Sequence, residues 1–547
     1  MKRNNSRRFR VLFLAALMLM AAAVVYAGGG SQPGSAPRRT TLEFLGPSPS
    51  IPPNGFDAVL EEVYKQTDST LNIRINYVFT EFTDVGQKIS LRIAAGEQLD
   101  GAFVAQWTNP SMQQMISQGL LTNLDSFFNN DQYPGLKKYF QKDYLDANSF
   151  ADAKGETHVY AVPFADGFGQ GTEGIFYRQD LADKYGIGKI NSYDDLIRYF
   201  EAIKKNETAM QPFVTLEGLP AWWWAGMIRD TPQTSQHNTD NISGTPFSVV
   251  IGDDGKAYVS RHFIPAMDPK YRSMVKGPYA NEDPLFGAKH SQEWYQKGYI
   301  GSDPLNDKDR EARFYAGRAA AFHGNASGFV STQNSLKASL PNAELGVWIW
   351  SPNFRFNMKK TEGSGFNAWN FLAVPSTSKN LNKVMDFMEW IYSDRNHYDL
   401  LSYGIPGKNW IPVGNDKMDT PANFNPASDA YGFPNYILAL NPQLLRFPVN
   451  MPDDVLKVTL AAGDASTFYK FPTSGFSFVS DAVESEMAKL NDLNSYQLAV
   501  NCGVYSNLEA EVVNIQRRFD EAGFAKAAAE AERQFNEFLK KNPYEGQ

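Results

Sequence analysis

The sequence predicts an α/β protein made of two or more compact units. Its 547 residues exceed what one hydrophobic core usually holds. A strand-like segment at 41–45, a helix over 56–66 and a strand at 72–78 follow one another in the order of a βαβ unit, which predicts a parallel sheet. A second alternation of strands and helices occupies 154–205 and supports the same fold class.

The segment 154–205 combines two strands with two helices. Its first strand alternates and ends at Pro163, and its second covers 175–177 after a glycine-rich passage. The longer helix begins at Ser192, a favourable N-cap residue, with Asp195 three positions later. Further along the chain, 252–255 (GDDG) lies between apolar runs and predicts a hairpin turn.

The glycine-rich passage contains a literal G-x-G-x-x-G over 169–174, with Asp194 about twenty residues later. A dinucleotide site needs a helix to begin at the third glycine, because the helix N-terminus holds the pyrophosphate. Here the chain continues Ile-Phe-Tyr-Arg, which is strand-like. The glycines therefore predict a flexible passage between compact units, and not a nucleotide site.

The first 27 residues have the pattern of a cleavable signal peptide. Five cations precede an apolar run over 11–25, and Ala27 offers a small residue for cleavage. An uncleaved anchor stays open, although fifteen residues are short for a membrane span. Residues 28–39 are rich in Gly, Ser and Pro and predict a disordered leader. Without the five signal-peptide cations, the chain has 47 basic and 60 acidic residues and is therefore negatively charged. This charge argues against a nucleic-acid partner.

Short motifs then carry a family resemblance. IFYRQDLADKYGI (175–187) and SYDDL (192–196) are similar to LYYRKDLxxKxGI and the TWDEL helix of the extracellular solute-binding proteins of ABC importers, family 1 or sugar-binding type. YGIPGKNW (403–410) resembles the YGIEGKHY motif of a sugar-import-associated subgroup that has a C-terminal helical domain. Other segments similar to the family lie at 88–100, 119–125, 314–325, 365–375 and 381–394. The resemblance covers about residues 40–540.

The resemblance implies a two-lobe α/β fold of the type II periplasmic-binding-protein class with three interlobe crossings. The crossings are expected near 166–172, 323–327 and 367–371. The expected N-terminal lobe is 40–168 plus 327–367, and the expected C-terminal lobe is 169–326 plus 368–547.

Candidate ligand contacts are aromatic and polar residues near strand ends and crossings, because sugars present apolar faces and hydroxyl rims. Of three adjacent tryptophans at 222–224, at least one should face a ligand or solvent. Structural roles, such as loop packing for Trp107 or a satisfied position for His323, remain open. Trp348, Trp350 and Trp390 are expected in the core. The candidates are Trp107, Asp166, Trp222, Trp223, His323, Asn325, Asn367 and Trp369.

No catalytic or metal motif is recognised. The six histidines are never three or four residues apart, and there is no GxSxG elbow. Asp303 to Asp309 lacks the glycine and closing Glu of a calcium loop. The single cysteine, Cys502, has apolar neighbours and should be a buried inert thiol. We expect no cofactor, no metal and no enzymatic activity.

The resemblance implies the substrate-binding component of an ABC importer. It would be a monomer that captures a solute, an oligosaccharide by preference, through hinge closure and delivers it to the permease subunits. Gly28 stands where a lipobox would have cysteine, so a periplasmic protein without a lipid anchor is expected. A binder of peptides or other polar solutes, an exported carbohydrate-active hydrolase or lyase, and a sensor subunit remain alternatives.

Overall fold

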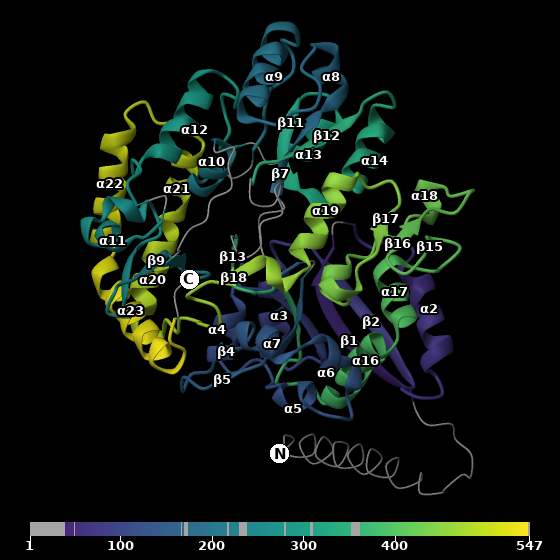
Figure 1. Cartoon of the computed structure of the whole chain (residues 1–547). Helices are drawn as coiled ribbons and strands as arrows, with labels where there is room; N and C mark the ends of the chain where they lie inside the picture. The colour runs from purple at the N-terminus through teal and green to yellow at the C-terminus, as the bar shows by residue number, and fades with distance from the viewer. Residues whose placement is uncertain are drawn as a thin grey trace, which may run out of the picture.

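The computed structural model arranges the chain as two lobes with a third group of elements beside them (Figure 1). The described residues are 39–48, 50–165, 167–168, 173–215, 218–228, 238–277, 280–306, 310–351 and 362–544. The predicted signal peptide and nearly all of the predicted leader lie outside them. None of the helices in this described part combines the length and the apolar character that a membrane crossing needs.

The first lobe contains a five-stranded sheet in the order β2-β1-β3-β14-β6. β1 is parallel to β2 and β3, whereas β14 runs antiparallel to β3 and β6. The predicted βαβ unit is confirmed, and the apolar side of its helix is buried. The strands are β1 Thr40–Pro47, β2 Ile73–Thr80, β3 Gly101–Val104, β6 Ala161–Phe164 and β14 Asn370–Ala373, with the small pair β4 Phe150–Ala151 and β5 Thr157–His158. The helices are α2 Phe56–Thr67, α3 Val85–Ala94, α4 Met112–Ser117, α5 Asp125–Phe128, α6 Pro134–Tyr139, α7 Lys142–Ala147, α16 Leu381–Ser393 and α17 Arg395–Tyr403.

The second lobe is built on a three-stranded antiparallel sheet in the order β11-β7-β12. Ser192 accepts a hydrogen bond from the backbone N–H of Asp195 at 3.1 Å, so the predicted N-cap of α9 is confirmed. The strands are β7 Glu173–Arg178, β11 Ala321–Asn325 and β12 Leu345–Ile349. The helices are α8 Gln179–Lys184, α9 Tyr193–Asn206, α10 Ala221–Ile228, α12 Phe286–Gln296, α13 Arg310–Tyr315, α14 Phe329–Ser339 and α19 Asp453–Ala462.

The third group joins a hairpin sheet to the C-terminal helices, which share one apolar core. The backbone N–H of Val259 donates to Glu532 at 3.0 Å, so α23 holds a strand that precedes it by more than 250 residues. The turn predicted at 252–255 is confirmed, with the N–H of Gly255 donating to the Gly252 carbonyl at 3.0 Å. The elements are β8 Thr239–Asn241, β9 Phe247–Ile251, β10 Ala257–Arg261, α11 Pro269–Met274, α20 Glu484–Asp492, α21 Asn494–Asn501, α22 Leu508–Glu521 and α23 Phe524–Lys541.

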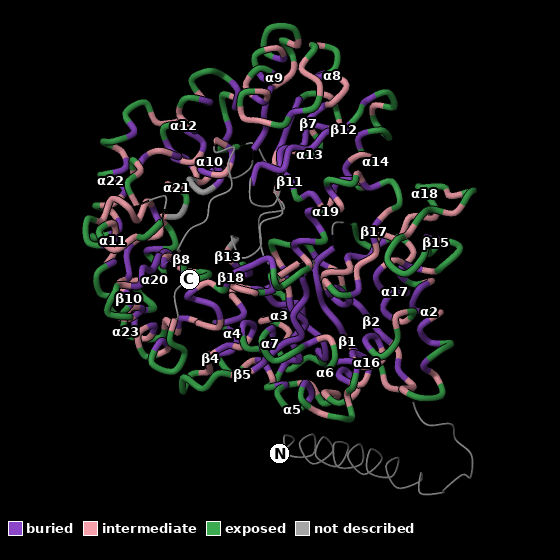
Figure 2. Tube along the Cα trace, viewed as in Figure 1, coloured by how far each residue is buried: buried purple, intermediate pink, exposed green. Residues whose placement is uncertain are grey.

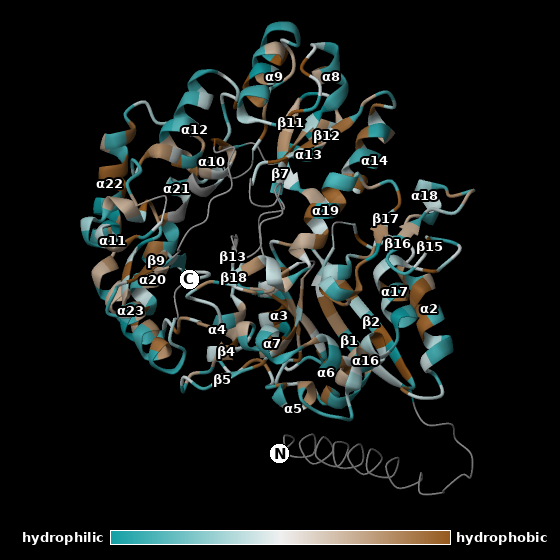
Figure 3. Ribbon diagram, viewed as in Figure 1, coloured by the Kyte–Doolittle hydropathy of each residue, from teal (hydrophilic) through white to brown (hydrophobic). Residues whose placement is uncertain are grey.

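Burial and hydropathy follow these layers. Figure 2 shows buried residues along β1, β2 and β7, while exposed residues concentrate on the outer turns of the helices. In Figure 3 the outward faces of α9, α22 and α23 are mostly hydrophilic, as expected for amphipathic helices around apolar cores. Trp348, Trp350 and Cys502 are buried, and burial raises the pKa of the Cys502 thiol to about 12, which agrees with the expected inert thiol.

The structure corrects the expected division into lobes. β12 pairs with β7, so the segment 327–349 belongs to the second lobe and the chain makes no crossing at 323–327. β14 lies between β3 and β6, and the buried apolar residues from 371 to 444 other than Trp410 pack into the first-lobe core. Among the described elements the chain therefore changes lobe between β6 and β7, between β12 and β14, and again after residue 444. Motif order does not determine lobe membership, because the sheet that a strand joins depends on its hydrogen-bonding partner.

Short elements complete the described chain near the last crossing. β13 Glu362–Ser364 pairs in parallel with β18 Phe468–Lys470, and β15 Ile411–Val413, β16 Lys417–Asp419 and β17 Phe447–Pro448 form a small sheet. The remaining short helices are α18 Pro426–Asp429 and the 3-10 turns Pro265–Met267, Ala326–Gly328, Asn435–Ile437, Pro442–Leu444, Ala465–Thr467 and Asp481–Val483.

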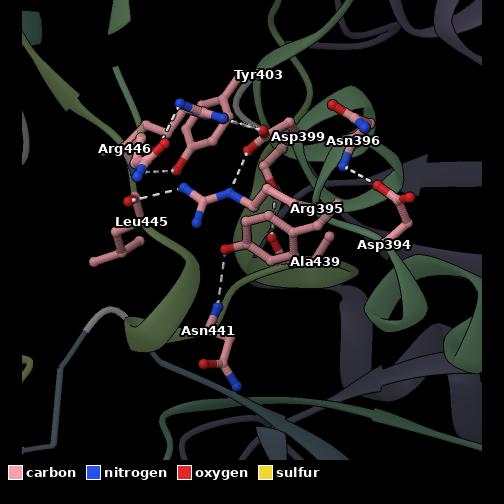
Figure 4. A network of polar contacts seen from close by, with 12 residues as sticks. Asp394, Arg395, Asn396, Asp399, Tyr403, Ala439, Asn441, Leu445 and Arg446 are labelled. Atoms are coloured by element: carbon pink, nitrogen blue, oxygen red, sulfur yellow. Dashed lines mark hydrogen bonds and ion pairs between the residues drawn. The ribbon is translucent and has the colours of Figure 1, made fainter. Parts of the chain in front are cut away.

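A buried ion network lies where the chain leaves the first lobe after residue 444 (Figure 4). Asp399 on α17 is 1% exposed and accepts hydrogen bonds from Arg395 at 3.1 Å and from Arg446 at 2.7 and 2.9 Å. Arg446 also lies over the ring of Trp410, whose indole N–H donates to the Gly404 carbonyl at 2.9 Å. Trp410 of the subgroup motif is thus a structural residue.

Candidate functional site

The aromatic residues Phe82, Trp107 and Trp369 gather at one edge of the first-lobe sheet. β1, β2 and β3 are parallel and end at this edge, and Phe82 and Trp107 follow the ends of β2 and β3. β14 is antiparallel to β3 and begins at the same edge, directly after Trp369. Ligands of open α/β sheets bind at the carboxyl ends of the strands. The sequence prediction for Trp107 rested on this rule, and the strand topology puts Trp369, a second sequence candidate, at the same edge.

These rings are open to solvent. Trp107 is 46% and Trp369 56% exposed, and Phe82 lies 6.4 Å from Trp107 between ring centroids. The loop that carries Trp107 is held by the Thr108 hydroxyl, which donates to the Ala105 carbonyl at 2.9 Å. Exposed large apolar side chains that sit together indicate a binding surface. We therefore regard this edge as one half of a candidate binding site.

The second half lies at the edge of the second-lobe sheet. His323 on β11 pairs with Ile175 two residues after the start of β7, so it lies near the end of the sheet where the chain enters from the first lobe. The indole of Trp223 on α10 covers the imidazole of His323, with ring centroids 3.7 Å apart. Trp350 follows the end of β12 and lies 6.1 Å from Trp223. Aromatic side chains thus also define this edge.

His323 is held in its neutral form. Burial and the positive charge of Arg310 lower the pKa of its imidazole to about 3. Its Nε2 atom is buried and has no hydrogen-bond partner among the described residues. Buried polar atoms normally have a partner, so an unpaired one at the end of a sheet is a candidate ligand contact.

The two edges are linked by the chain itself, because β7 follows β6 in the element order and starts at the His323 end of the second-lobe sheet. The third group also borders the first-lobe edge. Gly244 lies next to the backbone oxygen of Gln106, the residue before Trp107, and a side-chain Cβ at position 244 would be 3.9 Å from that oxygen. The Ser477 hydroxyl accepts a hydrogen bond from the backbone N–H of Ala151 at 3.1 Å, a second contact of this group with the first lobe.

The remaining predicted site residues divide into two sets. Asp166 and the side chain of Trp222 lie outside the described residues. Asn325 accepts hydrogen bonds from the N–H and the hydroxyl of Ser327 at 3.0 and 2.9 Å, and so caps the turn that follows β11. The amide of Asn367, in the orientation that satisfies its neighbours, donates to the carbonyls of Ala147 at 2.7 Å and Gly365 at 3.0 Å. These hydrogen bonds join the two asparagines to groups of the protein itself.

The adjacent tryptophans of the triplet 222–224 also have different surroundings. Trp224 is fully buried, and its indole N–H donates to the Ser291 hydroxyl at 2.9 Å, which makes it a core residue. Trp223 is 5% exposed and contacts His323. The sequence reasoning missed Phe82 and Arg310. Phe82 follows the end of a predicted strand, so the rule that singled out Trp107 would have found it.

One group of possible metal ligands occurs among the described residues. Oxygen or nitrogen atoms of Asp152, Glu156 and His158 lie within 4.8 Å of one another. Asp152 already accepts the backbone N–H of Lys154 at 2.8 Å and of Glu156 at 2.9 Å, and His158 is hydrogen bonded to Asp125 at 2.7 Å. These hydrogen bonds explain why the three side chains lie close together: they stabilise a hairpin turn. The loop expected to lack calcium, 303–309, lies partly outside the described residues.

Comparisons with known proteins agree with this architecture. The profile of the family described as bacterial extracellular solute-binding protein matches residues 60–413, and that of a domain of unknown function matches 472–540. A carbohydrate ABC transporter substrate-binding protein of Streptococcus pneumoniae is 22% identical over 511 residues, which cover 89% of each chain. The fructooligosaccharide ABC transporter substrate-binding protein FusA of the same organism is 22% identical over 417 residues, covering 72% of this chain and 67% of FusA.

Solved structures are similar over nearly the whole chain. The N-glycan transport solute binding protein NgtS from Streptococcus pneumoniae has a TM-score of 0.67 at 18% identity and covers 92% of this chain and 100% of its own. The alginate-binding protein AlgQ2 has a TM-score of 0.56 at 16% identity, with 91% and 98% covered. These likenesses show the two-lobe solute-binding fold.

Proposed function

The chain belongs to the bacterial extracellular solute-binding protein family, whose profile spans more than half of it, and from this premise we propose that it captures oligosaccharides for an ABC importer. The observation that carries the proposal is the pair of exposed tryptophans, Trp107 and Trp369, at the carboxyl edge of the first-lobe sheet. Flat apolar rings beside polar groups suit the faces and hydroxyl rims of sugars. Both relatives from Streptococcus pneumoniae are named as carbohydrate or fructooligosaccharide binding proteins, which supports a carbohydrate ligand.

The lobe connections suggest how capture works. Each lobe has its own sheet and its own hydrophobic core, so the two lobes can hinge against each other. A ligand that touches both Trp107 of the first lobe and His323 of the second stabilises the closed form, because only that form offers both contacts. The closed protein then delivers the ligand unchanged to a permease. We further propose that it works as an exported monomer without a lipid anchor.

The test is a thermal-shift screen and calorimetric titration with oligosaccharides, using peptides as the comparison panel. A ligand at 100 times its dissociation constant adds about 2.7 kcal/mol to the stability of the folded form. Trp107→Ala and Trp369→Ala should each weaken sugar binding by roughly 30-fold, the order expected for a central aromatic contact. Val513→Ala, which truncates an exposed side chain on α22, is the control that should leave binding unchanged.

Three outcomes would contradict the proposal. Stabilisation by peptides alone would identify the ligand class as peptides. Release of reducing ends from a bound oligosaccharide would identify a hydrolase or lyase. Sugar binding that is unchanged in both tryptophan variants would place the site elsewhere on the molecule.

A further inference from the structure

Arg310 lies at the same end of the second lobe as the predicted site residues. It is the first residue of α13, and a short turn leads from the end of this helix into β11. Helix and strand therefore run back to back, and Phe314 packs on Phe322 with ring centroids 4.9 Å apart. A six-residue helix is about 9 Å long, which corresponds to roughly three residues of a strand. The start of α13 thus lies level with His323 on β11.

The guanidinium of Arg310 is available for a ligand. Its side chain is only 20% exposed, yet the carboxylate nearest to its Nε is that of the adjacent Glu311, at 3.5 Å. That Nε atom is buried and has no hydrogen-bond partner among the residues that the structure describes. By contrast Arg178, whose side chain is 11% exposed, lies 2.6 Å from the carboxylate of Asp180. A partly buried guanidinium with an unsatisfied N–H is costly to desolvate, and a ligand oxygen that accepts this N–H would remove that cost.

His323 and Trp223 are the neighbouring side chains that would contact a ligand bound to the Arg310 guanidinium. The unpaired Nε2 of the neutral imidazole provides a second polar group, and the indole of Trp223 forms an apolar wall against the same ring. A guanidinium offers a planar fork of N–H donors that matches a carboxylate, and the imidazole can donate one more N–H. An anionic group here would neutralise Arg310 and satisfy His323 together.

We propose that Arg310 and His323 form a subsite for the carboxylate of an acidic sugar unit, so that the oligosaccharides taken up are anionic. This inference rests on the proposed function and narrows its ligand class. The carboxylate would accept two N–H groups from Arg310 and one from His323, while the sugar ring lies against aromatic side chains of the site. A sulfate ester can also pair two of its oxygens with the guanidinium fork, so the experiment compares its affinity directly with that of the carboxylate.

The experiment compares ligands that differ only in this group. Calorimetric titration uses a glucuronate-terminated oligosaccharide, its glucose-terminated counterpart of equal length, and a sulfated version. The variants are Arg310→Gln and Arg310→Lys, and the control is Arg318→Gln, which alters an exposed arginine just beyond the same helix. Thermal unfolding of each variant without ligand checks that it is folded.

The wild-type protein should bind the uronate roughly 10- to 100-fold more tightly than the neutral sugar, as expected for hydrogen bonds to a charged group. Arg310→Gln should remove this preference while changing affinity for the neutral sugar less than about 3-fold, and Arg318→Gln should retain it. Equal binding of both sugars, preference for the sulfate, or a preference that survives Arg310→Gln would overturn the subsite. Neutral-sugar binding alone leaves the proposed function standing, whereas binding of none of the three sugars overturns both.

Discussion

Replacement of His323 by glutamine should make the stability of the protein less sensitive to mild acid. In the folded protein the pKa of this imidazole is lowered to about 3 by burial and by the charge of Arg310. An unfolded chain has a histidine pKa of about 6.5. Between these two values the unfolded state binds the proton and the folded state does not, so the free energy of unfolding falls as pH falls from 6.5 toward 3.

The size of the effect follows from the two pKa values. Between pH 7 and pH 5 the unfolded imidazole goes from mostly neutral to almost fully protonated, while folded His323 stays neutral. Integrating the proton uptake over this interval gives a loss of about 2 kcal/mol in the free energy of unfolding. His262 and His290 also have pKa values lowered by burial, and both remain in the variant, so their contributions cancel in the comparison.

The assay is urea unfolding at pH 7 and pH 5, followed by tryptophan fluorescence. The wild type should lose about 2 kcal/mol more than His323→Gln over this interval. Val513→Ala, which truncates an exposed apolar side chain on α22, should show the wild-type dependence. Parallel pH dependences of wild type and His323→Gln would refute the reasoning, because they would mean that His323 takes up its proton equally in both states.

Further predictions concern the structural residues. Asp399→Ala should lower the free energy of unfolding by roughly 3 to 5 kcal/mol, because it leaves two arginines without their buried partner, whereas Arg517→Ala at an exposed pair should cost less than about 1 kcal/mol in the same urea titration. Trp410→Phe removes the bond to the Gly404 carbonyl and should cost about 1 kcal/mol without changing ligand affinity; a large loss of binding would show that it contacts the ligand. The thiol of Cys502 should react with a thiol reagent only in urea, and rapid labelling of the native protein would contradict its burial.

Local features of this protein were predictable from sequence because they depend on neighbouring residues. The first βαβ unit follows from hydrophobic periodicity, and the start of α9 follows from Ser192 and Asp195. The hairpin turn at 252–255 follows from glycine and aspartate between apolar runs. Trp107 could be placed at a candidate site because it follows a buried strand, whose end marks where ligands bind in open sheets.

The tertiary structure decided which strands are neighbours and which side chains face the site. Motif order correctly indicated a two-lobe fold, but the hydrogen bonds of β12 to β7 and of β14 to β3 assign their segments to lobes opposite to those expected. Of the tryptophan triplet, only packing shows that Trp224 is core and that Trp223 covers His323. No sequence motif singles out Arg310 as a candidate site residue. Strand partners, lobe membership and the pairing of a charge are set by residues distant in the sequence, so local patterns cannot specify them.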